Sequence, residues 1–166
     1  MSPELFEQLK RYIGFTEHDS ALLLELEPVI APRGDEVVAA FYAAARRDPE
    51  AMEVFSDESQ IERHQESLLQ WLLDMLRGPH DGAYYRKRLI IGRTHVRIGL
   101  AQHFMFTAMN VVRAALTDII CHHVARERCP EMIRTIGRIT DLELAIMVGT
   151  YADVQKRQDL EGLRDL

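Results

Sequence analysis

Apolar residues recur at spacings of three and four along almost the whole chain, and no segment keeps the strict apolar and polar alternation of a half-buried strand. This pattern predicts an all-α fold. The expected helices cover about residues 3–13, 17–30, 32–47, 56–77, 82–100, 102–128 and 130–163, with a short turn at 49–55.

The helix boundaries rest on capping residues and prolines. Ser2 precedes a proline and fits an N-cap, and Thr16 with an acidic residue three positions later fits a capping box. Gly14 fits the position after a helix C-terminus, and Gly78 followed by proline stops another helix. No repeat, low-complexity run or long linker interrupts the pattern, so we expect one domain over residues 1–166.

The last two expected helices carry more apolar residues than one buried stripe uses. Residues 142–148 read LELAIMV, which is apolar nearly all round, and residues 102–128 hold apolar side chains on two faces. A helix with two apolar faces is either central to its domain or packs against a second molecule. We favour the second alternative for part of this surface and predict a homodimer with a four-helix bundle at its centre.

Composition and charge exclude several classes of protein. The chain has 166 residues and a net charge of −6 with acidic and basic residues interspersed, so no basic face favours nucleic acid. There is no signal-peptide core and no uninterrupted run of eighteen apolar residues, which predicts no membrane span and a cytoplasmic location. Cys121 and Cys129 match neither a zinc pattern nor a disulfide framework. Phosphate-loop, Ser-His-Asp and HExxH motifs are absent as well.

One histidine, His95, lies between two glycines in the stretch IIGRTHVRIGL. A glycine inside a helix costs roughly 0.5–1 kcal/mol relative to alanine, so the missing β-carbons need a reason. Gly92 and Gly99 fall close to the azimuth of His95, beside Ile91 and Ile98. Either a flat group uses the space beside the histidine, or Gly99 is a C-cap and Gly92 is a contact between helices. The spacing alone leaves both alternatives open.

Two further side chains fit a polar site in apolar surroundings. His64 has apolar residues three positions before it and four positions after it, on or beside the apolar face of its helix. Tyr42 lies in the apolar run AAFYAAA, where a buried phenol needs a hydrogen-bond partner. By themselves, both are equally well explained as satisfied core residues. The adjacent His122 and His123 point about 100° apart, which argues against a shared metal ion.

Four segments stand out together: IGRTHVRIGL (91–100), GPHDGAY (78–84), AFYAAARRDPE (40–50) and IERHQESLLQWLLDML (61–76). With these segments the chain resembles, from about residue 12 to residue 155, the sensor globins of bacterial globin-coupled sensors, which are haem-based oxygen sensors. The IGxxHxxIGL pattern is fairly specific for that family, and the GPHD loop leans toward its globin-coupled histidine kinases. The resemblance implies a globin-like fold with an extra N-terminal helix and a C-terminal helix that leads toward an output domain.

The resemblance implies that haem b binds with His95 as the proximal iron ligand, while a backbone carbonyl about one turn earlier accepts the other ring N–H. The two glycines would then let the flat macrocycle lie close to the helix. The Tyr42 hydroxyl is expected to stabilise bound O2 more than CO. His64 departs from the family pattern and either donates a second hydrogen bond to O2 or ligates the iron at rest; a shift of one residue would bring in Gln65. The expected apolar wall comprises Leu68, Leu69, Leu72, Phe55, Ile91, Phe104 and Met109.

The leading hypothesis is a haem-based gas sensor domain that binds O2, CO or NO and passes its ligation state through a dimer to an output domain or partner protein. The chain ends at Leu166 without a kinase, cyclase or methyl-accepting sequence, so we expect the domain itself not to be an enzyme. The main alternative is a globin-type haem enzyme, a nitric oxide dioxygenase or a peroxidase, which needs a route for electrons. A haem-free globin-like interaction module is the third hypothesis.

Overall fold

The computed structural model describes residues 2–164, with side chains described through residue 161. All regular structure in that range is helical, which confirms the predicted all-α fold. The helices are α1 (Pro3–Ile13), α2 (Glu17–Ile30), η1 (Ala31–Arg33), α3 (Gly34–Ala45), α4 (Pro49–Met52), α5 (Glu58–Arg77), α6 (Gly82–Arg97), α7 (Gln102–His123) and α8 (Cys129–Arg164).

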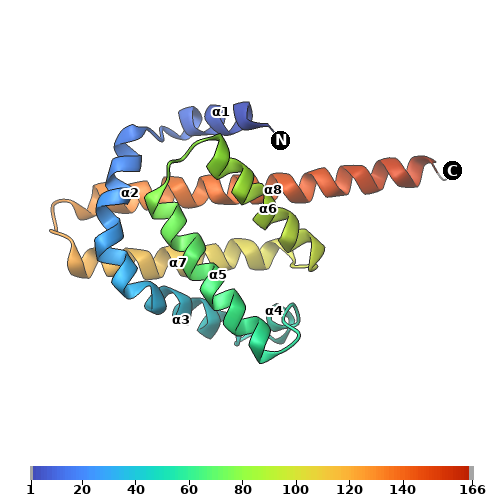
Figure 1. Cartoon of the computed structure of the whole chain (residues 1–166), viewed down its shortest axis with the longest axis horizontal. Coiled ribbons are helices and arrows are strands. Elements are labelled where there is room, and N and C mark those ends of the chain that lie inside the picture. Colours follow the sequence, from blue (N-terminus) through green and yellow to red (C-terminus); the bar gives the residue numbers. More distant parts are fainter. Residues whose placement is uncertain (1, 165–166) are drawn as a thin grey trace.

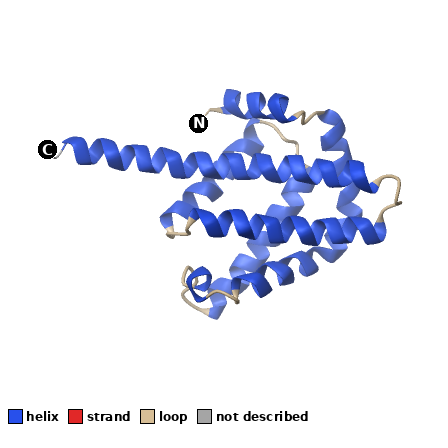
Figure 2. Ribbon diagram, turned by 180° about the vertical axis from the view of Figure 1, so that it is seen from behind, coloured by secondary structure: helices blue, strands red, loops and turns tan. Residues whose placement is uncertain are grey.

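Two long antiparallel helices organise the molecule. Helices α7 and α8 lie side by side, and α8 continues well beyond the other helices toward the C-terminus (Figure 1, Figure 2). Helices α5 and α6 cross in front of this pair in Figure 1, while α2 packs against α5 and α3 packs against α7. Helix α1 packs against α6 and α8, so the predicted N-terminal helix is part of the packed body.

Local capping explains where most helices begin. The Ser2 hydroxyl accepts a hydrogen bond of 3.4 Å from the backbone N–H of Leu5, and Thr16 and Asp19 form the predicted capping box. The Asp81 carboxylate accepts from two N–H groups in the first turn of α6, which carries His95. Each of these oxygens satisfies donors that the first turn of a helix leaves free.

Two boundaries differ from the sequence prediction. The third helix begins at Gly34, because the residues from the proline onward first form the short 3-10 turn Ala31–Arg33. Helix α7 ends at His123 rather than near residue 128, because the backbone of Val124 is extended. The remaining predicted helices agree with the structure to within a few residues.

Apolar side chains form one large cluster and one small cluster. The large cluster joins α1, α2, α5, α6, α7 and α8, and its fully buried members include Phe6, Leu23, Leu26, Leu76, Leu116 and Ile136. The small cluster consists of Val38, Tyr42 and Ile61, and it lies between α3 and α5. Leu68 packs against both clusters and therefore connects them.

A buried ion pair ties three helices together. The carboxylate of Glu143 in α8 accepts hydrogen bonds from Arg88 Nε (2.7 Å), from Trp71 Nε1 (3.0 Å) and from the Tyr84 hydroxyl. Burial, the largest single effect, would lower the pKa of Arg88, but Glu143 and Tyr84 together outweigh burial and raise it. This network fixes α5 and α6 against α8.

Candidate functional site

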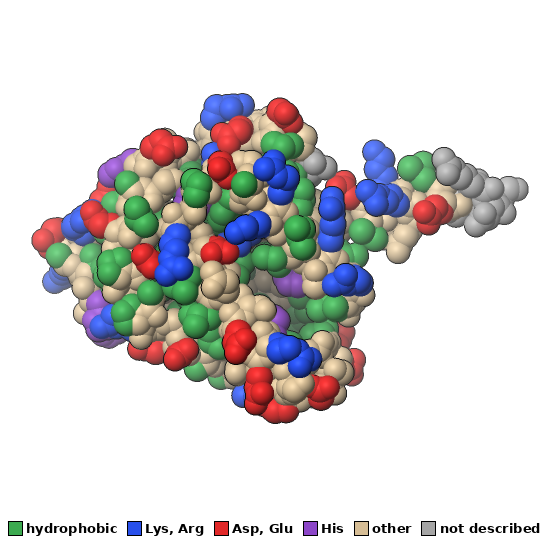
Figure 3. All heavy atoms as spheres, in the orientation of Figure 1, with side chains coloured by type: hydrophobic (Ala, Val, Ile, Leu, Met, Phe, Trp, Pro, Cys, Tyr) green, Lys and Arg blue, Asp and Glu red, His purple; other side chains and the backbone are tan. Residues whose placement is uncertain are grey.

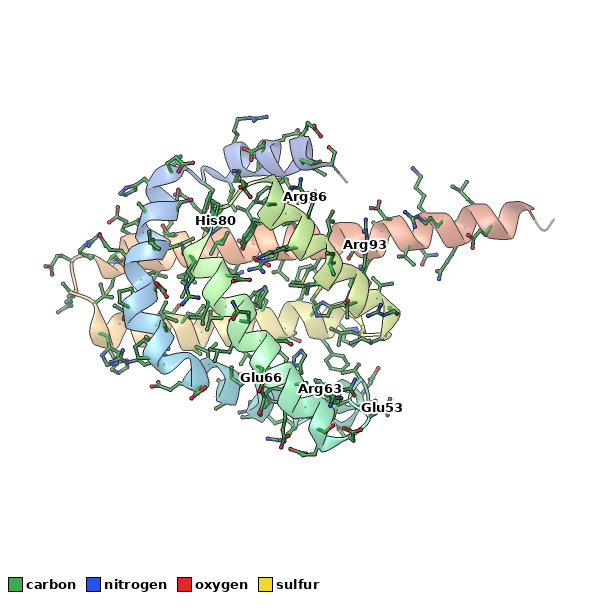
Figure 4. All side chains as sticks on the ribbon, viewed as in Figure 1. Glu53, Arg63, Glu66, His80, Arg86 and Arg93 are labelled. Atoms are coloured by element: carbon green, nitrogen blue, oxygen red, sulfur yellow. The ribbon has the colours of Figure 1, made fainter. Side chains whose placement is uncertain are left out.

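The helices that carry His64 and His95 are held by different neighbours. Helix α5 packs against α2 and α3, whereas α6 packs mainly against α8. Figure 3 shows a hollow on the face that α5 and α6 share, with histidine side chains inside it. Exposed charged residues of these helices, among them Arg63, Glu66 and Arg86, lie on the outside of this face (Figure 4). The fold thus presents imidazole groups to a hollow between two helices.

His64 lies in a small group of aromatic rings. The centroid of its ring lies 5.2 Å from that of Phe55, 5.8 Å from that of Phe41 and 5.9 Å from that of Tyr42. Nδ1 of His64 is hydrogen-bonded to the Tyr42 hydroxyl, which also lies 3.5 Å from the carbonyl oxygen of Ile61. The structure therefore brings together three of the predicted site residues, and it supplies the partner that a buried phenol needs.

Both partners of this hydrogen bond are uncharged at neutral pH. Burial raises the pKa of Tyr42 to about 12, against a smaller opposing effect of Arg46. Burial also lowers the pKa of His64 from its ordinary value. The site is thus dry enough to disfavour charge, which is the environment in which a single hydrogen bond has its largest effect.

His95 lies in the last turn of α6 and is partly buried. Neither of its ring nitrogens has a hydrogen-bond partner among the described residues, and Nδ1 is fully buried. The predicted hydrogen bond from the His95 ring to a carbonyl about one turn earlier is therefore absent from the described residues. Burial, and then the charge of His64, lower the pKa of His95 to about 4. At neutral pH the ring is an uncharged imidazole that lies close enough to His64 to interact electrostatically.

Gly92 serves the packing of its helix, so the explanation that it admits a flat group is wrong for Gly92; for Gly99, which lines a cavity, that explanation stays a prediction. A β-carbon on Gly92 would lie 2.6 Å from Thr150 Oγ1, which means that Gly92 is a close contact between α6 and α8. Gly99 has a φ of +75°, and a β-carbon there would meet nothing within 4 Å. Gly99 therefore ends the helix in the left-handed conformation that glycine adopts at no cost.

The predicted apolar wall is divided between the two clusters. Leu72 and Met109 are buried in the large cluster, and Ile91 packs against it. Leu69 packs against the small cluster, and Leu68 packs against both. Leu68, Leu69 and Leu72 lie on α5 with His64, and Ile91 lies on α6 with His95; the roles of all these side chains as a pocket wall stay predictions.

A cavity of about 230 Å³ lies where the segment around α4 meets the turn between α6 and α7. Phe104 is the one predicted wall residue that lines it, together with Val54 and Leu100. The carboxylate-bearing residues Glu50 and Glu53 also line it, so this cavity has a partly polar wall. The sequence contained no local signal for this cavity, because its lining comes from two separate turns.

Sequence reasoning also missed the contacts of α8 with the segment that carries His95. The Tyr151 hydroxyl donates a hydrogen bond of 2.6 Å to the carbonyl oxygen of Leu100. Thr150, the preceding residue, is the side chain that abuts Gly92. Helical spacing places both residues on α8, but spacing does not tell which helix a face meets.

Comparison with known proteins identifies the family. The Protoglobin family matches residues 2–157, so the chain belongs to the Protoglobin family. A curated relative, the heme-based aerotactic transducer HemAT of Halobacterium salinarum, is 22% identical over 129 residues, which make up 77% of this chain. The chain spans only 26% of the length of that relative.

Solved structures confirm the predicted globin fold and the resemblance to globin-coupled sensors. The globin domain of the Geobacter sulfurreducens globin-coupled sensor superposes with a TM-score of 0.82 at 27% identity, over 87% of this chain and 96% of that one. The ferric globin domain of Escherichia coli DosC gives a TM-score of 0.70 at 17% identity, over 87% and 98% of the two chains. This second likeness concerns the fold alone. The lean toward histidine kinases stays a prediction.

Proposed function

We propose that this chain is a haem-based gas-sensing globin domain in which His95 holds the iron. The observation that supports the proposal most is the imidazole of His95: neutral, without a hydrogen-bond partner among the described residues, and electrostatically close to His64. A neutral imidazole nitrogen is the form that ligates iron. When bound, haem iron supplies reversible binding of a diatomic gas such as O2, CO or NO.

The surrounding residues fit this group. The rings of Phe41 and Phe55 lie against His64, and both of them and Leu68 pack on the small cluster, so the surroundings of His64 are apolar. Neither Cys121 nor Cys129 lies in a CxxCH sequence of the kind that attaches haem covalently. A non-covalently held haem b is therefore part of the proposal.

Signalling is proposed to run from α6 to α8. Thr150 and Tyr151 of α8 contact the His95 segment, and they precede the part of α8 that extends beyond the body (Figure 1). A displacement of His95 would therefore reach α8 through direct contacts. Sensing further requires two arrangements whose balance shifts with ligation, typically by about 1–3 kcal/mol.

The dimer belongs to the same proposal. Helix α7 is long and apolar enough to cross a membrane by length and composition, yet a buried helix of a globular protein meets the same test. Only 33% of its most apolar window is buried, and Phe106 remains 46% exposed. We propose that a second copy of the chain covers this side of α7 and forms a bundle with α8. Sedimentation tests this arrangement: the wild type should be a dimer and Phe106→Asp a monomer. The same oligomeric state in both proteins, whether dimer or monomer, would refute it.

Absorption spectra test the function. We expect a Soret band in the purified protein and distinct ferrous, O2-bound and CO-bound spectra. A protein without haem absorbance would instead be an interaction module. Sustained consumption of nitric oxide with a reductant would show a dioxygenase and contradict a pure sensor.

A further inference from the structure

The hydroxyl of Tyr42 is already engaged by the protein. Tyr42 is 1% exposed, and its hydroxyl oxygen contacts only Nδ1 of His64 and the carbonyl oxygen of Ile61 among the described residues. A tyrosine that stabilised a gas directly would have to give up the histidine contact. Its hydroxyl therefore has a second use, as a partner of the histidine.

The direction of this hydrogen bond follows from the acceptors open to the phenol hydrogen: if Nδ1 carried the imidazole hydrogen, the phenol hydrogen would have only the Ile61 carbonyl, 3.5 Å away. The phenol has one hydrogen to donate, and the contact to Nδ1 of His64 is shorter than the 3.5 Å contact to Ile61, which lies at the outer limit for a hydrogen bond. The hydrogen of Tyr42 therefore points to Nδ1. A neutral imidazole carries one N–H, so a ring that accepts at Nδ1 carries its hydrogen on Nε2.

The second ring nitrogen of His64, Nε2, is available to donate a hydrogen bond. Nε2 has no hydrogen-bond partner among the described residues and is not fully buried. The rings of Phe41 and Phe55 both pack against the imidazole, which limits its rotation. The Nε2–H group of His64 is thus held in a defined orientation and has no hydrogen-bond acceptor among the described residues.

We propose that Tyr42 is a positioning residue: by donating to Nδ1 it fixes the tautomer of His64 with hydrogen on Nε2, and His64 is the side chain that donates to the gas. This inference rests on the proposed haem site. The family resemblance predicts that the Tyr42 hydroxyl hydrogen-bonds to the gas. In this proposal His64 makes that hydrogen bond, and Tyr42 affects the gas only by orienting His64.

The same hydrogen bond opposes ligation of the iron by His64. Ligation through Nε2 requires that nitrogen to be free of hydrogen, which moves the hydrogen to Nδ1 and forces the Tyr42 hydroxyl to release its acceptor. The phenol would then have only the distant Ile61 carbonyl as acceptor. Tyr42 thus favours the gas-donating state of His64 over the iron-ligating state.

Oxygen dissociation from the haem-loaded ferrous protein tests the inference in a double-mutant cycle. We expect Tyr42→Phe and His64→Leu each to speed O2 dissociation by about tenfold, the loss of one hydrogen bond. The double variant should match His64→Leu alone. Tyr12→Phe, which changes an exposed phenol, is the matched control. An equal effect of Tyr42→Phe in both backgrounds would overturn the proposal, because the phenol would then reach the gas itself.

Nitrogen NMR of the ferrous CO complex, with ¹⁵N-labelled histidine, provides a readout independent of gas kinetics. The wild type should show His64 with hydrogen on Nε2, and Tyr42→Phe should lose this single tautomer. Hydrogen on Nδ1 in the wild type would overturn the proposal. The absence of a Soret band before either experiment would instead refute the haem site, and the inference with it.

Discussion

Gly92 of α6 and Thr150 of α8 touch so closely that an added methyl group would not fit. A β-carbon on Gly92 would lie 2.6 Å from Oγ1 and 2.8 Å from Cγ2 of Thr150. Three residues after Gly92 comes His95, so the close approach fixes the distance between the proposed iron ligand and α8. We regard this contact as the closest of those through which a displacement of His95 in α6 would reach α8.

Gly92→Ala is expected to lower the free energy of unfolding by about 1–3 kcal/mol, the cost of overpacking a close contact. Thr150→Ala should rescue part of this loss, because it removes the two nearest atoms but leaves Cβ, 3.2 Å away. Urea unfolding of the haem-loaded variants measures both. The control is Gly137→Ala, where a β-carbon meets nothing within 4 Å and stability should rise by up to about 1 kcal/mol. Equal behaviour of Gly92→Ala and Gly137→Ala would contradict the account.

Tyr151→Phe is expected to loosen the turn after α6 without removing haem. The lost hydrogen bond, 2.6 Å long, holds the carbonyl of Leu100 to α8. Hydrogen exchange around residues 98–105 should speed up, and its dependence on CO binding should weaken. Leu160→Ala, on the exposed extension of α8, should leave exchange in this turn unchanged. Unaltered exchange in Tyr151→Phe would show that this contact carries no coupling.

Arg88→Met is expected to destabilise the protein by about 3–5 kcal/mol, because it leaves the Glu143 carboxylate buried without its cation. Arg128→Met breaks a surface pair with Glu25 and should cost only about 0–1 kcal/mol. Thermal or urea unfolding of the two variants compares them directly. Similar losses in both would mean that the buried network does not hold α5 and α6 against α8.

His80 is expected to make the protein less stable as the pH falls. Burial lowers the pKa of His80 below 6.5, although its hydrogen bond to the Met75 carbonyl opposes the shift. Below pH 6.5 the unfolded chain binds a proton at His80 that the folded chain does not bind, so the folded state loses stability as the pH falls. Above pH 6.5 His80 has no effect on stability. The slope contributed by one histidine is at most about 1.4 kcal/mol per pH unit.

Unfolding at about pH 7.5 and about pH 5.5 measures this slope. His80→Gln should flatten it, while the other buried histidines keep their share in both proteins. His122→Gln, at an exposed position, is the control and should leave the slope unchanged. A slope that His80→Gln leaves intact would remove His80 from the acid response.

The sequence predicted the helices well because caps and prolines act locally. Thr16 with Asp19 and the proline after Gly78 mark boundaries that the structure keeps. Similarly, the apolar spacing around His64 placed it near the apolar face of α5. These features depend on residues within one or two turns of each other.

The geometry of the site could not be predicted in the same way, because it depends on which helices meet. The reason for Gly92 lies on α8, and the partner of the Tyr42 hydroxyl lies on α5. The missing acceptor for Nδ1 of His95 also escaped prediction. Sequence patterns indicated the candidate residues, whereas tertiary packing decided what each one touches.

Haem titration of His95→Ala tests the central claim most directly. The wild type and the control His103→Ala, which changes an exposed histidine next to the same turn, should bind one haem per chain with a full Soret band. His95→Ala should bind haem weakly or not at all, and His64→Ala should retain it. Full and stable haem binding by His95→Ala would contradict the assignment of His95 as the residue that holds the iron.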